Sequence, residues 1–227
     1  MAEVQKLGTV KELGEFYLVG APLYEQLVAF NAVNAHMVSV EDAARARLAG
    51  VSDSWTRTSV ASVAIRGENL MLYRPSPLMN LAVALAAVKA HRKGFYLERP
   101  RVYDTIRAIA KAEETMEPED RTALVVSQEG DFELTPDHKV SRFLFRQVRQ
   151  RYFAEKTDGT ILFCGLSTNS ERGVVNHVRF DDPQDGSDLY CDDLTLDLDF
   201  DALGVCRTGE VSAKKGLIAK LISKIGI

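Results

Sequence analysis

The stretch Thr58–Arg74, TSVASVAIRGENLMLYR, carries the clearest fold signal in the chain. Two runs of strand-forming residues, Thr58–Arg66 and Leu70–Arg74, flank the turn-forming triplet Gly67-Glu68-Asn69. Short apolar, β-branched runs separated by a glycine-containing turn are typical of a β-hairpin. The stretch therefore predicts two antiparallel strands.

One strand and two helices are predicted before the hairpin. Glu15–Gly20 has the composition of a strand, and apolar residues at helical spacing follow Pro22. Ser39, with Asp42 three residues later, is typical of the N-terminus of a second, short helix, because the serine side chain can accept a hydrogen bond from the backbone there.

A helix and a strand are predicted after the hairpin. Ser76-Pro77 is typical of a helix start and Gly94 of a helix end, and Phe95–Glu98 has strand character. The resulting order is β-α-β-β-α-β, with one extra helix after the first. This order favours a ferredoxin-like arrangement for the first half of the chain.

The second half alternates helix and strand signals over seven segments. They are a helix at Arg101–Met116, a hairpin of Thr122–Ser127 and Asp131–Leu134, a long helix at Asp137–Ala154, and strands at Thr160–Leu166, Val174–Phe180 and Leu194–Phe200. The overall prediction is an α+β fold with a ferredoxin-like first half, an antiparallel β-rich second half and a C-terminal amphipathic helix. Residues 1–116, 121–208 and 209–227 form these parts, either as separate units or as one compact domain.

Composition narrows the class of protein. Of 227 residues, 46% are hydrophobic and 26% charged, which is ordinary for a folded chain, and the net charge of −4 argues against a general polyphosphate binder. Three cysteines without CxxC spacing predict neither a disulfide framework nor a zinc site. The sequence has no signal-peptide pattern and no apolar run long enough to span a bilayer, so we expect a cytoplasmic protein. The common nucleotide, metal and hydrolase motifs are absent, so we expect no cofactor and no metal.

A row of basic residues occupies one face of the predicted long helix. Lys139, Arg142, Arg146 and Arg149 follow i, i+3, i+7, i+10 spacing. Guanidinium groups in such a row can bind phosphates or a line of carboxylates. The alternatives are a solvated basic face, or a face that meets the nine aspartates between Asp181 and Asp201.

The final segment, KKGLIAKLISKIGI, predicts an amphipathic helix. Its apolar face comprises Leu217, Ile218, Leu221, Ile222 and Ile225, and Lys220 and Lys224 lie on the polar side. An isolated helix this short is marginal in water, so we expect it to dock. Three surfaces compete to receive it: the core of the same chain, a groove on a partner or a second copy, and an anionic membrane surface.

Three functions stay open at this stage. The leading hypothesis is a non-enzymatic interaction or assembly subunit that docks through the C-terminal helix and the basic helix face. The first alternative is a subunit whose basic residues contact the RNA or DNA backbone. The second is an enzyme whose active site is assembled from scattered residues without a local motif.

Overall fold

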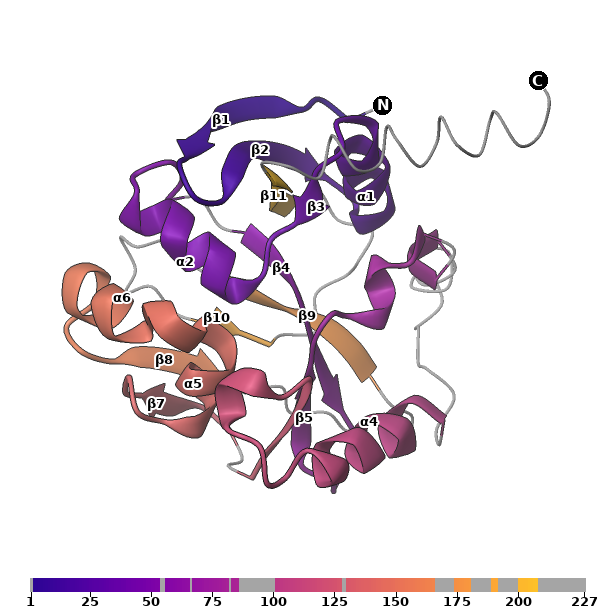
Figure 1. Ribbon diagram of the computed structural model, residues 1–227. Coiled ribbons are helices and arrows are strands. Elements are labelled where there is room, and N and C mark those ends of the chain that lie inside the picture. The colour runs from indigo at the N-terminus through magenta and orange to yellow at the C-terminus, as the bar shows by residue number, and fades with distance from the viewer. Residues whose placement is uncertain are drawn as a thin grey trace, which may run out of the picture.

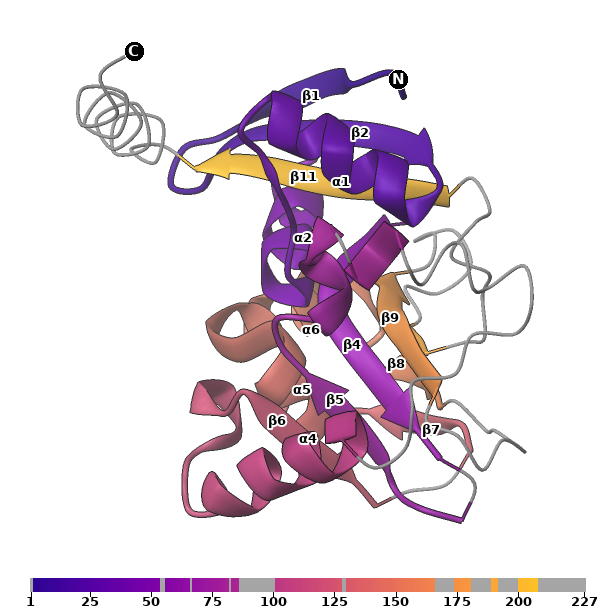
Figure 2. The same ribbon diagram turned by 90° about the vertical axis from the view of Figure 1, so that its right-hand side faces the viewer.

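A computed structural model describes residues 2–53, 56–65, 67–81, 83–85, 101–127, 130–165, 174–180, 189–191 and 200–207. These residues form a mixed 11-stranded sheet with helices against both of its faces (Figures 1 and 2). The α+β class is confirmed.

The elements have the following bounds. The helices and helical turns are α1 (Leu23–Ala32), α2 (Val40–Leu48), η1 (Pro77–Met79), α4 (Arg101–Ala112), η2 (Pro118–Asp120), α5 (Lys139–Phe145), η3 (Arg146–Val148) and α6 (Arg149–Lys156). The strands are β1 (Gln5–Val10), β2 (Gly14–Ala21), β3 (His36–Met37), β4 (Thr56–Ala64), β5 (Leu70–Tyr73), β6 (Ala123–Val126), β7 (Phe132–Leu134), β8 (Ile161–Cys164), β9 (Val174–Phe180), β10 (Leu189–Tyr190) and β11 (Phe200–Arg207).

The strand β4, the first strand of the predicted hairpin, lies at the centre of the sheet. It pairs with β5, β9 and β11. Its side chains alternate between two cores: Val60 and Ala64 pack with α2, α5 and α6, whereas Ala61 and Val63 pack with α1 and α4. A strand covered on both faces needs apolar residues at successive positions, which explains the near-continuous apolar run of this segment.

The ferredoxin-like prediction is wrong. The strand β11 lies between β2 and β4 and pairs with β2 along its whole length, from Phe200↔Ala21 to Arg207↔Gly14. The first predicted strand therefore has its partner about 180 residues further along the chain, not within a self-contained first half. Figure 2 shows β1, β2 and β11 together at one end of the molecule, and strands from both predicted halves share one sheet.

Several local predictions are confirmed. β4 and β5 are antiparallel, with Ser62 opposite Leu72, as the hairpin signal indicates. Ser39 caps α2 by accepting a hydrogen bond from the backbone N–H of Asp42 at 3.1 Å. The strand β9 has the predicted bounds, Val174–Phe180.

Other predictions are corrected. The segments Thr122–Ser127 and Asp131–Leu134 contain β6 and β7, but β6 pairs with β5 and β7 with β8, so they do not form a hairpin with each other in the described part of the chain. The predicted helix Asp137–Ala154 is interrupted at Arg146. Of the predicted strand Leu194–Phe200, residues 194–199 lie outside the described residues, and the strand β11 runs from Phe200 to Arg207.

Some predictions lie outside the described residues. They are the strand Phe95–Glu98, most of the helix before it, and the C-terminal helix with residues 209–227.

The helix α1 packs closely against β11 because Gly204 has no side chain. The Phe30 ring, 1% exposed, packs directly over Gly204 of β11. A Cβ at residue 204 would lie 2.5 Å from two ring carbons of Phe30, well inside van der Waals contact. Only glycine therefore fits β11 at this position.

We expect Gly204→Ala to lower the free energy of unfolding by about 2 kcal/mol, because the added methyl forces the Phe30 ring or the strand to shift. Urea denaturation would measure this. The control is Gly8→Ala, where the new Cβ would meet only Val51 methyls, at 3.5 and 3.6 Å, so its stability should stay within about 0.5 kcal/mol of the parent. Equal losses for both variants would contradict the packing explanation.

His177 of β9 is a buried histidine in the sheet. Its Nδ1 donates to the backbone carbonyl of Thr58 at 2.7 Å, and its Nε2 has no hydrogen-bond partner among the described residues. Burial lowers the pKa of His177 from 6.5 to about 4, more than the Thr58 hydrogen bond raises it. The folded protein therefore holds this imidazole neutral.

The protein should lose stability as pH falls from 6.5 towards 4, because the unfolded chain binds a proton on His177 that the folded chain rejects. Asparagine can keep the donor to Thr58 without titrating. His177→Asn should therefore change the slope of melting temperature against pH in this window, with a smaller loss than the parent. Identical slopes from pH 7 to 4 for parent and variant would exclude His177 as the source.

Candidate functional site: a cavity lined by arginines

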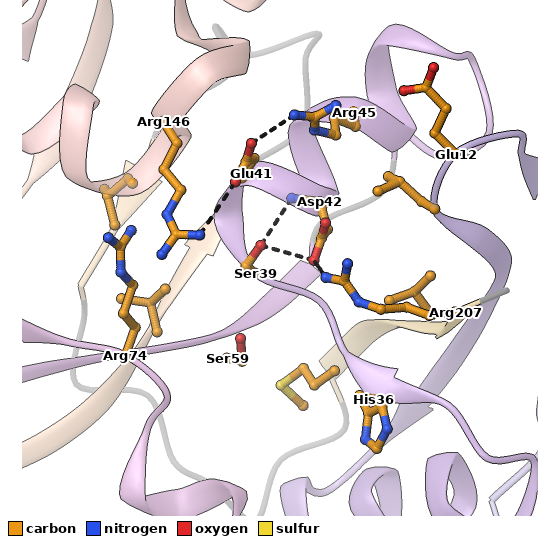
Figure 3. Close-up of a pocket in the computed structure, with 15 residues that line it drawn as sticks. Glu12, His36, Ser39, Glu41, Asp42, Arg45, Ser59, Arg74, Arg146 and Arg207 are labelled. Atoms are coloured by element: carbon orange, nitrogen blue, oxygen red, sulfur yellow. Dashed lines mark hydrogen bonds and ion pairs between the residues drawn. The ribbon is translucent and has the colours of Figure 1, made fainter. Parts of the chain in front are cut away.

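A cavity of about 400 Å³ opens between α2, the end of α5, and strands β3, β4 and β11 (Figure 3). We call it the arginine hollow. Its charged lining consists of Arg45, Arg74, Arg146 and Arg207 with Glu12, Glu41 and Asp42. The segments that supply these side chains are far apart in sequence.

The first turn of α2 brings two carboxylates into the hollow. Asp42 accepts hydrogen bonds from the Ser39 hydroxyl at 3.0 Å and from Nη2 of Arg207 at 2.8 Å, and its side chain is only 9% exposed. Carboxylates at a helix N-terminus also interact favourably with the helix dipole. Asp42 is therefore fixed as an ion-pair partner that orients Arg207.

Glu41 stands between two arginines. It accepts a hydrogen bond from Arg45 at 2.8 Å, one helical turn away, and its other oxygen lies 3.9 Å from Nη1 of Arg146. The second distance is too long for a direct hydrogen bond. Arg146 is thus less tightly paired with a carboxylate than Arg45 or Arg207.

Arg74 is held by the backbone. Its Nε donates to the carbonyl of Arg121 at 2.8 Å, Nη2 donates to that of Glu119 at 2.5 Å, and Nη1 donates to that of Phe143. The guanidinium also lies 4.2 Å from the centre of the Phe143 ring. Arg74 therefore contributes a fixed positive charge at the edge of the hollow.

Arg146 has an unusual backbone. Its φ of 49° and ψ of −122° fall in a region that glycine adopts readily and other residues rarely do. This conformation ends α5 and starts a new helical direction. Its Nε is buried and has no hydrogen-bond partner among the described residues.

Two positive charges compete in the hollow. Figure 3 shows the Arg74 and Arg146 side chains on the same side of it, with Glu41 beyond Arg146. Burial, and then repulsion by Arg146, lower the pKa of Arg74 to about 10. An added negative charge at this point would offset this lowering of the Arg74 pKa, since opposite charges favour the ionised guanidinium.

The predicted basic row is divided by the interruption at Arg146. Arg142 pairs with Glu117 and with Glu119 at 2.9 Å, and Arg149 lies 3.6 Å from Glu119. Burial raises the pKa of Glu119, but hydrogen bonds from its own backbone and from Arg142 outweigh this, so its pKa is lowered.

The four residues of the row therefore meet different surroundings. Lys139 donates to the Ser127 hydroxyl at 3.1 Å. Arg146 is the member of the row that reaches the arginine hollow. The carboxylates that meet the row come from Glu41 and the η2 segment. Of the nine aspartates between Asp181 and Asp201, all but Asp201 lie outside the described residues.

Most of the hollow was not predicted from the sequence. Arg45, Arg74, Arg207 and Glu41 were not singled out, and Asp42 was recognised only as part of a helix start. Arg207 and Asp42 are 165 positions apart. They meet because β11 pairs with β3, the short strand that precedes α2. The predicted contact residues of the C-terminal helix lie outside the described residues.

Comparison with known proteins gives one informative match. No family model matches the chain, and no curated protein matches it in sequence. Among solved structures it is similar to one described as "Accommodation of massive sequence variation in Nanoarchaeota by the C-type lectin fold", with a TM-score of 0.57, 10% identity, and coverage of 90% of this chain and 98% of that chain. The likeness is one of fold. It supports a C-type lectin-like arrangement in place of the ferredoxin-like one.

The described residues contain neither a metal-binding cluster nor a membrane-spanning helix. No group of three or more His, Cys, Asp or Glu side chains suited to a metal ion occurs among the described residues. Within the same part of the chain, no helix combines the length and apolar character needed to cross a membrane.

Arg146→Gly should raise the free energy of unfolding by about 1 kcal/mol, because glycine adopts the backbone conformation at this position without strain. Chemical denaturation would measure the change. The control is Arg151→Gly in the middle of α6, where the same substitution removes a helical residue and should cost about 1 kcal/mol. A loss of stability in both variants would show that the Arg146 backbone is not strained.

Proposed function

We propose that the protein is a non-enzymatic interaction subunit that binds an acidic side chain of a protein partner in the arginine hollow. The observation that carries the proposal is the incompletely satisfied guanidinium of Arg146 beside the fixed charge of Arg74. The Arg146 side chain is 43% exposed. A carboxylate can accept two parallel hydrogen bonds from a guanidinium, so Arg146 suits such a ligand.

The fold neighbour is consistent with a function that depends on individual side chains and not on the fold. That structure is described as accommodating massive sequence variation on the C-type lectin fold. A fold that accommodates such variation does not fix which side chains serve as the contact surface. The function of this chain is therefore argued from its own hollow and not from the fold.

The other hypotheses have less support. For the nucleic-acid hypothesis, Arg142 and Arg149 already meet carboxylates of the same chain, which reduces the charge available to phosphates. For an enzyme, the carboxylate of Asp42 already accepts hydrogen bonds from Arg207 and Ser39 of the same chain. Docking through the C-terminal helix and the basic helix face stays part of the proposal.

Poly-L-glutamate is a suitable first probe, because a chain with net charge −4 has no general attraction to polyanions. Arg146→Glu should weaken its binding at low salt by tenfold or more, roughly the value of one lost charge-assisted hydrogen bond. Arg107→Glu, with its side chain 63% exposed on α4 and outside the hollow, is the matched control and should bind like the parent. Binding would be measured by fluorescence anisotropy.

Two results would overturn the proposal. Equal weakening by Arg146→Glu and Arg107→Glu would show that only overall charge matters. Tighter binding of polyuridylate than of poly-L-glutamate under the same conditions would favour the nucleic-acid hypothesis, because phosphate contacts are strongest at low salt.

A further inference from the structure

A second cavity adjoins the arginine hollow. It has a volume of about 320 Å³, and we call it the apolar hollow. His36, Met37 and Ser59 line both cavities, so the two share a wall formed by β3 and β4.

The apolar hollow is built from two sides. Leu27 and Phe30 of α1 form one side, and Pro75, Met79 and Leu81 form the other. Leu81 is 37% exposed and is one of three large apolar residues exposed to this degree in the described part of the chain. Covering it would remove apolar surface from water, which favours binding.

Adjacent charged and apolar hollows suit an extended peptide. In an extended chain, side chains two positions apart point to the same face and are separated by about 6.8 Å. One such side chain can enter the arginine hollow while the other enters the apolar hollow. The arginines of the first hollow favour an acidic side chain, and the apolar lining of the second favours an aliphatic or aromatic one.

We propose that the partner contributes a short extended segment with the pattern acidic–any–apolar, or its reverse. The Asp or Glu side chain lies against Arg146 in the arginine hollow, and an aliphatic or aromatic side chain lies against Leu81 and Met79 in the apolar hollow. This inference rests on the proposed function for its acidic half. The apolar half is independent of it.

The experiment is a selection of phage-displayed random heptapeptides on the full chain. The selected peptides should be enriched in Asp or Glu two positions from Leu, Ile, Met or Phe. A fluorescein-labelled peptide from the selection is then titrated with protein variants, and fluorescence anisotropy gives its dissociation constant.

Matched substitutions separate the two hollows. Leu81→Gln should weaken peptide binding about tenfold, through loss of buried apolar contact. Leu162→Gln on β8 starts from the same 37% exposure, lies outside both cavities, and should leave binding unchanged. Arg146→Glu should abolish binding, as should replacing the acidic residue of the peptide with its amide.

The outcomes distinguish the two proposals. If Arg146→Glu abolishes binding but Leu81→Gln and Leu162→Gln behave alike, the acidic half stands and the inference about the apolar hollow is wrong. If Leu81→Gln alone weakens binding, the carboxylate contact and with it the proposed function are wrong. Selection of peptides without an acidic residue, or of none, contradicts both.

Discussion

The hydrogen bonds of the Arg74 guanidinium connect several segments in the interior of this molecule. It follows β5 directly and donates to carbonyls of Arg121, Glu119 and Phe143, so it joins the central hairpin to η2, to the start of β6 and to α5. Backbone carbonyls stabilise its charge but do not neutralise it. The adjacent hollow is lined by this arginine and three others, with the carboxylates of Glu12, Glu41 and Asp42.

Arg146 lies in the hollow because the helix is interrupted at this residue. A regular helix from Asp137 to Ala154 would carry Arg146 on the same face as Arg142 and Arg149, among the carboxylates of η2. The break at φ 49° turns it instead into the hollow, beside Glu41 and Arg74. The chain accepts a strained backbone there, and such strain is commonly found at sites that bind ligands. The strained backbone and the unsatisfied Nε both belong to Arg146, the residue on which the proposed carboxylate contact depends.

The sequence predicted what depends on neighbouring residues and failed where distant segments meet. The β4–β5 hairpin, the Ser39 cap and the bounds of β9 follow from local propensity and turn chemistry. The position of β11 does not, because nothing in GVCR or its surroundings specifies pairing with β2. For the same reason Arg146 was recognised as a basic residue, whereas its neighbours in the hollow, Arg74 and Arg207, were not. A break in an otherwise helical pattern, without glycine or proline, leaves no local signal.

The pairing of β2 with β11 also sets the timing of folding. Leu18 of β2 pairs with Leu203 of β11, so β2 is synthesised long before its partner strand. Until then one edge of β2 and one edge of β4 expose unpaired backbone groups, which other chains can bind. Contacts so distant in sequence also slow the search for the native arrangement. The newly made chain is therefore vulnerable to aggregation until β11 has paired, and chaperones that shield strand edges would act on it in that interval.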